Sequence, residues 1–296
     1  MIRVLGILIG LGFVIVTAWS LGNGVYAYVT SPHEETVEHR FHKHAKDLHL
    51  ASDGPFGKFD RAQLQRGFQV YQEVCAACHS LNLVSFRNLG DKGGPFYDPH
   101  YPNANDNPYA KTIAAEYQIN DIDSETGDAI QRPGTTADRF PSPYPNEAAA
   151  RAGNGGALPP DLSVIAKARH GGPAYIASLL SGFANPPAGL EVPAGQYYNL
   201  YMPGDVSSAW KGQGHVPPGG FIAMPPPLRA GGVTFDDGTP SSVEQQAKDV
   251  SAFLMWTAEP KLEDRKQMGF AVMIYLILLT ALLYASYRRV WRNESH

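Results

Sequence analysis

The stretch from Asp60 to His79 reads DRAQLQRGFQVYQEVCAACH. Its apolar side chains recur every three or four residues, at Leu64, Phe68, Tyr71, Val74/Cys75 and Cys78. This spacing predicts a helix with one buried face, and Asp60 is a residue type that caps the start of a helix. Residues 75–79 place two cysteines three positions apart and a histidine directly after the second. Two such thiols face the same side of a helix and can add to the two vinyl groups of one haem, with His79 under the iron.

The cysteine content argues against the other common uses of this pattern. Cys75 and Cys78 are the only two cysteines among 296 residues, so a disulfide framework and a four-cysteine zinc or iron–sulfur site are excluded. A zinc site would need two further ligands at matching spacing. A redox-active pair would be expected in a cytosolic protein with a βαβ pattern, which this chain lacks. We therefore predict one haem c, attached covalently through Cys75 and Cys78 and ligated by His79.

Methionine is the leading candidate for the second axial ligand of the iron, because methionine and histidine are the usual choices. Of the six methionines, Met202 and Met224 lie in loops outside the apolar segments and the predicted helices. Each precedes a proline, which favours an extended backbone. Three prolines follow Met224 and stiffen its loop, and this favours Met224. Met202 remains an alternative, and ligation by a second histidine is a third.

The composition predicts a mainly α domain with long loops. Glycine and proline number 30 and 24, while a hydrophobic content of 44% excludes wholesale disorder. The formal net charge of −4 argues against a nucleic-acid partner. No run alternates with period two for more than a few residues, so no extended sheet is expected. Residues typical of helix starts are Asn107-Pro108, Asn146, Asp161 (for a helix over 162–170), Pro173 and the capping box Ser241-x-x-Glu244, and residues typical of helix ends are Gly153, Gly171 and Pro260.

Two apolar segments lie near the ends of the sequence. Residues 1–27 have a short positive start and an apolar run, which predicts a signal peptide, with an uncleaved anchor as the alternative. Residues 268–287 carry no charge and are long enough to cross a bilayer as one helix. Basic and aromatic residues flank their far end, as at a membrane interface. We therefore expect an exported domain, a transmembrane anchor at 268–287 and a cytoplasmic tail at 288–296.

Six stretches, in the same order along the chain, resemble the cytochrome c1 family. They are GPFGKFD from Gly54, residues 65–79 around the haem motif, ALPPDLS from Ala157, ARHGG from Ala168, AMPPPL from Ala223 and AKDVSAFLMW from Ala247. The resemblance runs from about residue 52 to 292 and is far more specific than the haem motif, which all c-type cytochromes share. It implies a periplasmic cytochrome c-like haem domain at residues 52–267 and one C-terminal transmembrane helix.

The same resemblance implies the residues of the site. His79 and Met224 would be the axial ligands of the iron, and Arg169 would meet a haem propionate. The other pocket residues that it implies are Asn154, Ala157, Pro159, Pro160, Ile165, Tyr175, Leu179 and Leu180. On purely structural grounds, Arg169 could instead complement the end of its helix, and Tyr175 could belong to the core.

The resemblance also implies a function. The protein would be the electron-transfer subunit of a respiratory or photosynthetic quinol–cytochrome c oxidoreductase in a bacterial inner membrane, within a dimeric complex. It would relay one electron from the Rieske iron–sulfur protein to a soluble or membrane-bound cytochrome c. Quinol oxidation would reside in cytochrome b, so the chain would not be an enzyme by itself. The alternatives are a haem subunit of another periplasmic oxidoreductase or terminal oxidase, and a haem-based sensor.

Three further regions raise separate expectations. Residues 28–51 form an extension with His33, His39, His42, His44 and His49, for which a solvated linker is expected and a metal chelator is the alternative. The Gly/Pro-rich residues 185–223 lack the cysteines that staple this segment in some relatives, so what makes it rigid is open. Residues 91–150 carry ten acidic and four basic side chains. They predict either a solvated loop or an acidic face that steers a basic cytochrome c.

Overall fold

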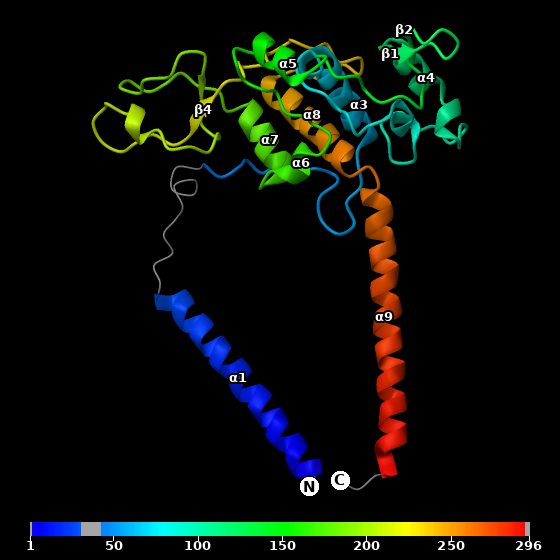
Figure 1. Cartoon of the computed structure of the whole chain (residues 1–296), viewed down its shortest axis with the longest axis vertical. Helices are drawn as coiled ribbons and strands as arrows, with labels where there is room; N and C mark the ends of the chain where they lie inside the picture. Colours follow the sequence, from blue (N-terminus) through cyan, green and yellow to red (C-terminus); the bar gives the residue numbers. More distant parts are fainter. Residues whose placement is uncertain (1, 31–42, 294–296) are drawn as a thin grey trace.

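The computed structural model describes residues 2–30 and 43–293. Within these ranges the chain is mainly helical, as predicted (Figure 1). The helices are α1 Ile2–Thr30, α3 Arg61–Val70, α4 Pro108–Ala115, α5 Glu147–Gly153, α6 Ile165–Ala168, α7 Gly172–Leu180, α8 Val243–Ala258 and α9 Leu262–Val290. Shorter helical turns occur at Tyr71–Cys75, Phe86–Gly90, Ala104–Asp106, Ser207–Ala209 and Trp291–Asn293. The strands form two antiparallel pairs, β1 Gln118–Ile122 with β2 Ala129–Pro133, and β3 Tyr197–Asn199 with β4 Gly220–Ile222.

The core of the globular domain forms where α3 packs against α8 (Figure 1). A Cβ added to Gly67 of α3 would stand 2.1 Å from the carbonyl oxygen of Asp249 in α8, so only glycine allows this approach. Phe68 meets Phe253 edge to face, with ring centroids 5.6 Å apart, and Phe253 stacks on Trp256. Helices α6 and α7 also pack against α8. The apolar positions predicted for residues 60–75 therefore do face one shared core.

Three of the predicted helix starts are confirmed. The side chains of Asp60, Asn107 and Asn146 each accept a hydrogen bond from a backbone N–H of the first turn, at α3, α4 and α5. At α8 the prediction was wrong by one residue. Ser242, not Ser241, caps the helix by accepting from the amide of Gln245, while the Ser241 hydroxyl accepts from the Gln246 side chain.

The predicted helix over 162–170 is wrong, because only Ile165–Ala168 is helical. The carboxylate of Asp161 does not cap this helix. It accepts hydrogen bonds from the Ser80 hydroxyl at 2.8 Å, the Asn82 amide at 2.7 Å and the Ser163 amide at 2.8 Å. A carboxylate with three partners elsewhere is not free to start a helix. Gly171 takes a positive φ of 81° directly before α7, so it begins that helix rather than ending the previous one.

Two local features were not predicted. The helix from Asp60 does not continue as an α-helix to Cys78, because Tyr71–Cys75 form a π-helical turn. Such a turn inserts an extra residue and rotates everything that follows it. The four strands are the second feature. They are three to five residues long, too short for an alternating pattern to appear in the sequence.

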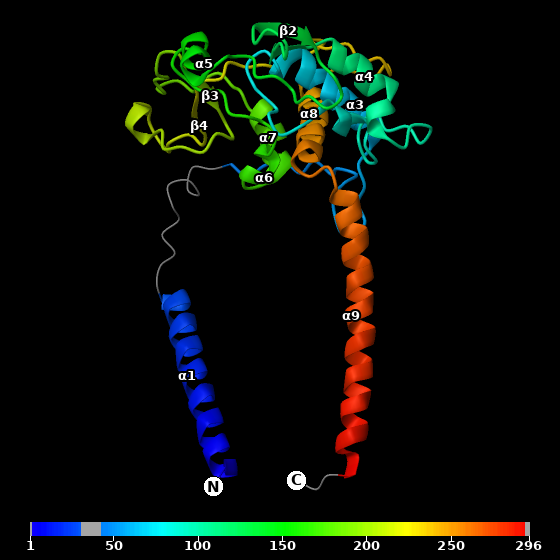
Figure 2. The same cartoon turned by 45° about the vertical axis from the view of Figure 1, so that its right-hand side comes forward.

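Residues 181–227 form a lobe built around β3 and β4, which lies on the far side of α7 from α4 (Figure 2). Its own small core consists of Leu190, Tyr198 and Val206, with Trp210 and Phe221 packed against it. Backbone hydrogen bonds join Lys211 to Gly189 at 2.7 Å and Glu191 to Ala209 at 3.0 Å. Packing and backbone pairing therefore hold the Gly/Pro-rich segment in place of a disulfide.

Residues 43–50, here called the N-terminal strap, run alongside α7. The backbone amide of Lys46 donates to the Ser178 hydroxyl at 2.7 Å, and its ammonium donates to Ser181 at 2.9 Å. The ammonium groups of Lys43 and Lys46 lie 5.2 and 5.7 Å from the ring centre of Tyr201. The strap thus contacts both α7 and the β3–β4 lobe, which differs from the solvated linker expected for this part of the extension. His33, His39 and His42 lie outside the described residues, whereas His44 and His49 are exposed.

In the described ranges, two helices are long and apolar enough to cross a membrane, over Arg3–Thr30 and Leu262–Asn293. Helix α9 follows α8 after the break at Pro260 and projects from the globular domain (Figure 1). Leu262 in its first turn is buried in the core, but the large apolar side chains from Met268 onward are mostly exposed. A long helix with an exposed apolar run of this kind is the form expected of a membrane anchor.

Candidate haem-binding site

The cysteine–histidine motif folds into one tight turn. The backbone amides of Cys78 and His79 both donate to the carbonyl of Cys75, at 3.1 and 2.9 Å. Both thiols are free and half-buried. Burial, with a smaller contribution from Cys78, raises the pKa of the Cys75 thiol to about 12. Two unpaired sulphurs on one turn are available for covalent attachment to a single group.

The imidazole of His79 is oriented by a residue 81 positions away. Its Nδ1 lies 2.8 Å from the carbonyl oxygen of Pro160. A carbonyl can only accept, so the proton resides on Nδ1 and the lone pair on Nε2, which is the tautomer that binds a metal. Burial lowers the pKa of His79 from its ordinary 6.5, against the opposing effects of the Pro160 carbonyl and Asp161. The ring is therefore neutral at neutral pH and can act as a ligand.

Backbone contacts hold the Pro160 segment beside the motif. The Leu162 amide donates to the carbonyl of Ser80 at 2.9 Å, and the Leu83 amide donates to the Ser163 hydroxyl at 3.0 Å. The Tyr71 hydroxyl donates to the carbonyl of His79 at 3.1 Å. Together with the three bonds to Asp161 described above, these contacts fix Pro159 and Pro160 relative to His79.

Helices α6 and α7 carry the next group of predicted pocket residues. Ile165 and Leu180 pack against the same core cluster as Cys75. Tyr175 is buried. Burial raises the pKa of its hydroxyl, and the nearby charge of Arg169 opposes that rise. Arg169 is itself exposed and donates to the carbonyl of Ala168 at 3.3 Å, so its guanidinium stands at the surface near Tyr175. At this position the guanidinium would meet a negatively charged edge of a bound ligand.

The turn after α5 contains Asn154 and Ala157. The Asn154 side chain donates to the Tyr144 hydroxyl at 3.1 Å and to the carbonyl of Ala150 at 2.7 Å. The amide of Ala157 donates to the carbonyl of Asn154 at 3.1 Å. Asn154 therefore stabilises the turn that leads to Pro159, and its side-chain NH2 group already donates hydrogen bonds within the protein.

The two candidate methionines lie just beyond opposite ends of the β3–β4 strand pair. The register pairs Tyr197 with Ile222 and Asn199 with Gly220. Met224 follows the first pair, whereas Met202 follows the second and packs over Gly220. Both are half-buried. No hydrogen bond in the described part of the chain links Met224 to His79.

The donor set fits haem c. Two free thiols lie on one turn, a neutral imidazole has its Nε2 available, and a thioether lies in a proline-stiffened loop. In the described ranges, no group of three histidine, cysteine or acidic side chains is placed to hold a metal ion by itself. An imidazole with a free Nε2, such as that of His79, suits a group that brings its own metal ligands, as a porphyrin does.

A mainly helical domain with this turn, followed by one long apolar helix, has the features of a membrane-anchored c-type cytochrome. The chain belongs to the cytochrome c1 family, whose model matches residues 50–294.

Curated relatives agree with this assignment. The cytochrome c1 of Rhodospirillum rubrum is 42% identical over 259 residues, which cover 82% of this chain and 86% of that protein. A mitochondrial cytochrome c1 heme protein of Arabidopsis thaliana is 41% identical, with 90% of this chain and 78% of that protein covered. The cytochrome b/c1 of Bradyrhizobium diazoefficiens is 46% identical over 81% of this chain. The match spans only 34% of that longer protein.

Sequence reasoning missed two residues that support the site. Tyr71 was predicted only as part of an apolar face, yet its hydroxyl reaches the carbonyl of His79. Asp161 was predicted as a helix cap. In the sequence, only its position directly after Pro160 indicated that Asp161 lies close to His79.

Proposed function

We propose that this chain relays single electrons from the Rieske iron–sulfur protein to a cytochrome c, as the haem subunit of a quinol–cytochrome c oxidoreductase. Membership of the cytochrome c1 family supports the electron-transfer role. The observation that carries the proposal is the turn at residues 75–79, where two free thiols and an oriented imidazole stand together.

Cys75 and Cys78 would hold one haem c covalently, with His79 and Met224 as the axial ligands. When bound, the haem supplies a one-electron iron couple. The chain supplies the rest. The Pro160 carbonyl keeps the imidazole in its metal-binding tautomer, and Tyr175, Ile165 and Leu180 exclude water. Arg169, exposed at the rim, would pair with a propionate, while Asn154, Ala157, Pro159 and Leu179 would line the pocket.

In this proposal the chain contributes no catalytic group, and quinol oxidation takes place in cytochrome b. Residues 1–27 serve as signal peptide, residues 52–267 form the periplasmic haem domain, residues 268–287 span a bacterial inner membrane and residues 288–296 remain in the cytoplasm. The partners are cytochrome b, the Rieske protein and a cytochrome c within a dimeric complex. The Bradyrhizobium relative supports the partnership, because its name joins cytochrome b and c1 in one protein.

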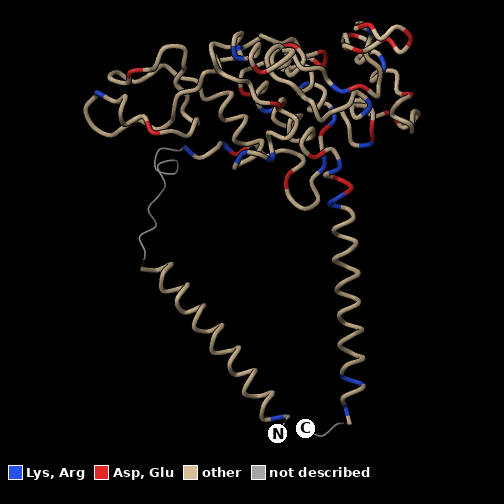
Figure 3. The backbone as a smooth tube through the Cα atoms, in the orientation of Figure 1, with Lys and Arg blue, Asp and Glu red and all other residues tan. Residues whose placement is uncertain are grey.

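An acidic surface is proposed as the docking site for the cytochrome c. Acidic residues recur along the segments on the side of α4 and β1–β2 (Figure 3). Some are internally neutralised, since Arg132 pairs with Asp121 at 2.6 Å and with Asp138 at 2.7 Å. The remaining negative charge would steer a basic partner, and such steering weakens as salt screens it. The rate of cytochrome c reduction should therefore fall as the ionic strength rises. A rate that does not change with salt would show that this surface is not the docking site.

A pair of methionine variants tests the site. Met224→Leu should lower the midpoint potential by a large margin and let the reduced protein bind carbon monoxide, because a ligand is lost. Met202→Leu, at the other end of the same strand pair, is the matched control. It should change neither the midpoint potential nor the binding of carbon monoxide. The reverse pattern would transfer the ligand role to Met202.

Isolation of the native complex tests the function. Purified from membranes, the chain should retain cytochrome b and the Rieske protein, and quinol should reduce its haem until a quinol-site inhibitor is added. Retention with oxidase or dehydrogenase subunits instead would favour another periplasmic oxidoreductase. Carbon monoxide binding by the wild-type chain would favour a sensor.

A further inference from the structure

Residues 51–58 form a closed loop, here called the collar, beside the start of α9. The Lys58 amide donates to the carbonyl of Ala51 at 2.9 Å and closes the loop at its base. A Cβ on Gly57 would stand 2.0 Å from the carbonyl of Asp53, so the loop folds tightly on itself. In Figure 1 this segment hangs below the globular domain next to the first turns of α9.

Polar side chains of α9 hold the collar in place. The ammonium of Lys266 donates to the carbonyls of Ser52 at 2.6 Å and Gly57 at 3.3 Å. The carboxylate of Glu263 accepts from the amide of Phe59 at 2.9 Å. These contacts join residues more than 200 positions apart. The collar is therefore fixed to the helix that leaves the domain, rather than free in solvent.

The tip of the collar carries an exposed aromatic ring at the level where the apolar run of α9 begins. Phe56 is 73% exposed, the largest value for a large hydrophobic side chain in the described residues 43–261. Its ring lies edge to face with Phe270, with centroids 5.5 Å apart. Phe270 is two residues beyond Met268, the first residue of the apolar run. At a rise of about 1.5 Å per residue, this places it roughly 3 Å inside the hydrocarbon boundary.

We infer that the collar is a second membrane contact, with Phe56 inserted among lipid chains beside Phe270. An aromatic ring held by a rigid loop at the membrane boundary is the usual form of an interfacial anchor. The exposed ring is continuous with the exposed face of α9, so one bilayer covers both. One helix alone leaves the attached domain free to tilt. A second contact, fixed to that helix by Lys266 and Glu263, sets how the domain stands over the membrane.

Spin labels test this inference in the full chain, purified with its native partners and placed in phosphatidylcholine nanodiscs. A label at Phe56→Cys should relax faster with dissolved oxygen than with a water-soluble nickel chelate, as a label at Phe270→Cys must. Ile122→Cys on β1, also largely exposed at 67%, is the aqueous control and should show the opposite order. If position 56 behaves like position 122, or is shielded from both reagents by a partner protein, the inference is wrong.

A second variant tests the attachment to α9. In a Lys266→Met background the label at position 56 should become more mobile and shift toward the nickel reagent. An unchanged depth and mobility would contradict the role given to Lys266. Neither experiment depends on haem chemistry. Labelling of the wild-type chain, in which thioether bonds would consume both cysteines, would count against the proposed haem attachment. The depth at position 56 would then be measured with Cys75 and Cys78 replaced by serine.

Discussion

The two sides of the candidate site are built in different ways. The histidine side belongs to the main core: the turn at 75–79 continues from α3, and α3 is packed and hydrogen-bonded to α8. The methionine side belongs to the β3–β4 lobe, whose own core has three buried apolar residues. The lobe is joined to the rest by contacts with the end of α7 and the N-terminal strap. We therefore expect less free energy to hold Met224 in place than to hold His79.

This difference predicts an order of events. Stress such as denaturant or heat should release Met224 while the helices and His79 stay in place, because local opening starts where buried contacts are few. Each of the following variants acts on one side only, and together they test whether the two sides are energetically separate.

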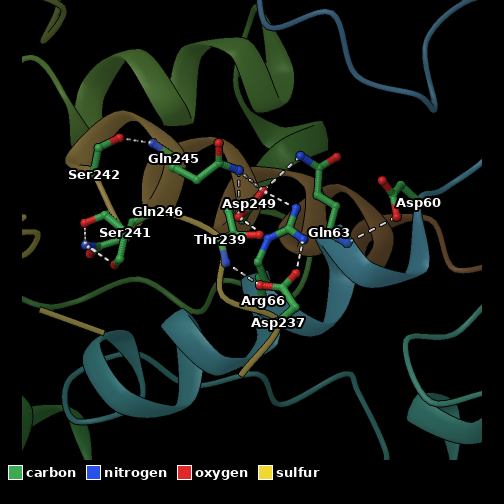
Figure 4. Close-up of polar contacts among 10 residues, drawn as sticks. All are labelled: Asp60, Gln63, Arg66, Asp237, Thr239, Ser241, Ser242, Gln245, Gln246 and Asp249. Carbon is green, nitrogen blue, oxygen red and sulfur yellow. Dashed lines mark hydrogen bonds and ion pairs between the residues drawn. The ribbon is translucent and has the colours of Figure 1, made fainter. Parts of the chain in front are cut away.

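The largest effect is expected for Arg66 on the histidine side. Its guanidinium donates to the fully buried carboxylate of Asp249 at 2.8 Å and to Asp237 at 2.7 Å, and Gln63 and Gln245 complete the network (Figure 4). Burial opposes the charge of Arg66, but the bonds to both carboxylates raise its pKa. Arg66→Leu would leave Asp249 buried without its cation, and should cost about 3–5 kcal/mol of global stability in a urea titration followed by circular dichroism.

Asp237→Asn is the control for this variant. Asp237 is 40% exposed where Asp249 is 0% exposed, so its loss should change global stability far less. Equal losses in the two variants would show that the buried carboxylate is not what makes Arg66 important.

The next effect is expected for Asn199 on the methionine side. Its buried side chain donates to the carbonyl of Leu179 at 2.7 Å and accepts from the Tyr201 amide at 2.9 Å. Asn199→Ala leaves the buried Tyr201 amide without its partner and removes one of two donors from the Leu179 carbonyl, which keeps the Gly182 amide at 3.2 Å. The cost should be about 1–3 kcal/mol. We expect this cost in the lobe alone, seen as carbon monoxide binding to the reduced protein at lower urea. The exposed Asn185→Ala in the same lobe should change nothing, and an equal effect there would argue against the specific bonds.

A matched pair of valines compares the two cores directly. Val250 and Val206 are both buried, at 0% and 1% exposure, in the main core and the lobe respectively. Each change to alanine removes two methylene equivalents, or about 1.6 kcal/mol before any cavity cost. Val250→Ala should lower the midpoint of global unfolding, whereas Val206→Ala should lower only the midpoint for loss of the methionine ligand. If both variants shift both midpoints equally, the two sides form one cooperative unit.

The smallest effect is a pH dependence on the histidine side. Burial works to raise the pKa of Asp161, but hydrogen bonds from Asn82, Ser163 and Ser80 outweigh it and hold the pKa below its ordinary 3.8. The stability that this carboxylate provides is therefore present above pH 3.8 and is lost as the pH falls through the lower folded value. Wild type should lose stability below about pH 4, and Asp161→Asn should lose less over the same range. If the two proteins lose the same stability as the pH falls, Asp161 is not the source of the pH dependence.

Much of the helical framework could be predicted, because caps and apolar spacing act within one turn. Asp60, Asn107 and Asn146 begin helices by contacts three residues away. Asp161 shows the limit of this reasoning. Its carboxylate has better partners at Ser80 and Asn82, about 80 positions distant, and no local pattern records that competition. The π-helical turn at Tyr71–Cys75 is similar, since its apolar spacing is indistinguishable from that of a continuous helix.

The candidate site likewise combines a local motif that the sequence predicts with long-range contacts that it does not. The motif at 75–79 is local and was read from the sequence directly. Its orientation depends on the carbonyl of Pro160, a backbone group that any residue carries, so the sequence held no trace of it. The choice between Met202 and Met224 depends on which end of the β3–β4 ladder faces the site, and three-residue strands gave no pattern from which to predict that ladder.

Gly67 has a consequence that reaches beyond the core. Helix α3 leads to the two thiols within ten residues, and α8 leads past Pro260 into the lipid-crossing helix. The two helices approach closely at position 67, where even a methyl group would overlap the opposite backbone. Substituting alanine would push the paths apart and change the height of the thiol-bearing turn above the bilayer. In the proposed function, a single glycine would thus help to set the distance between the haem and the membrane surface.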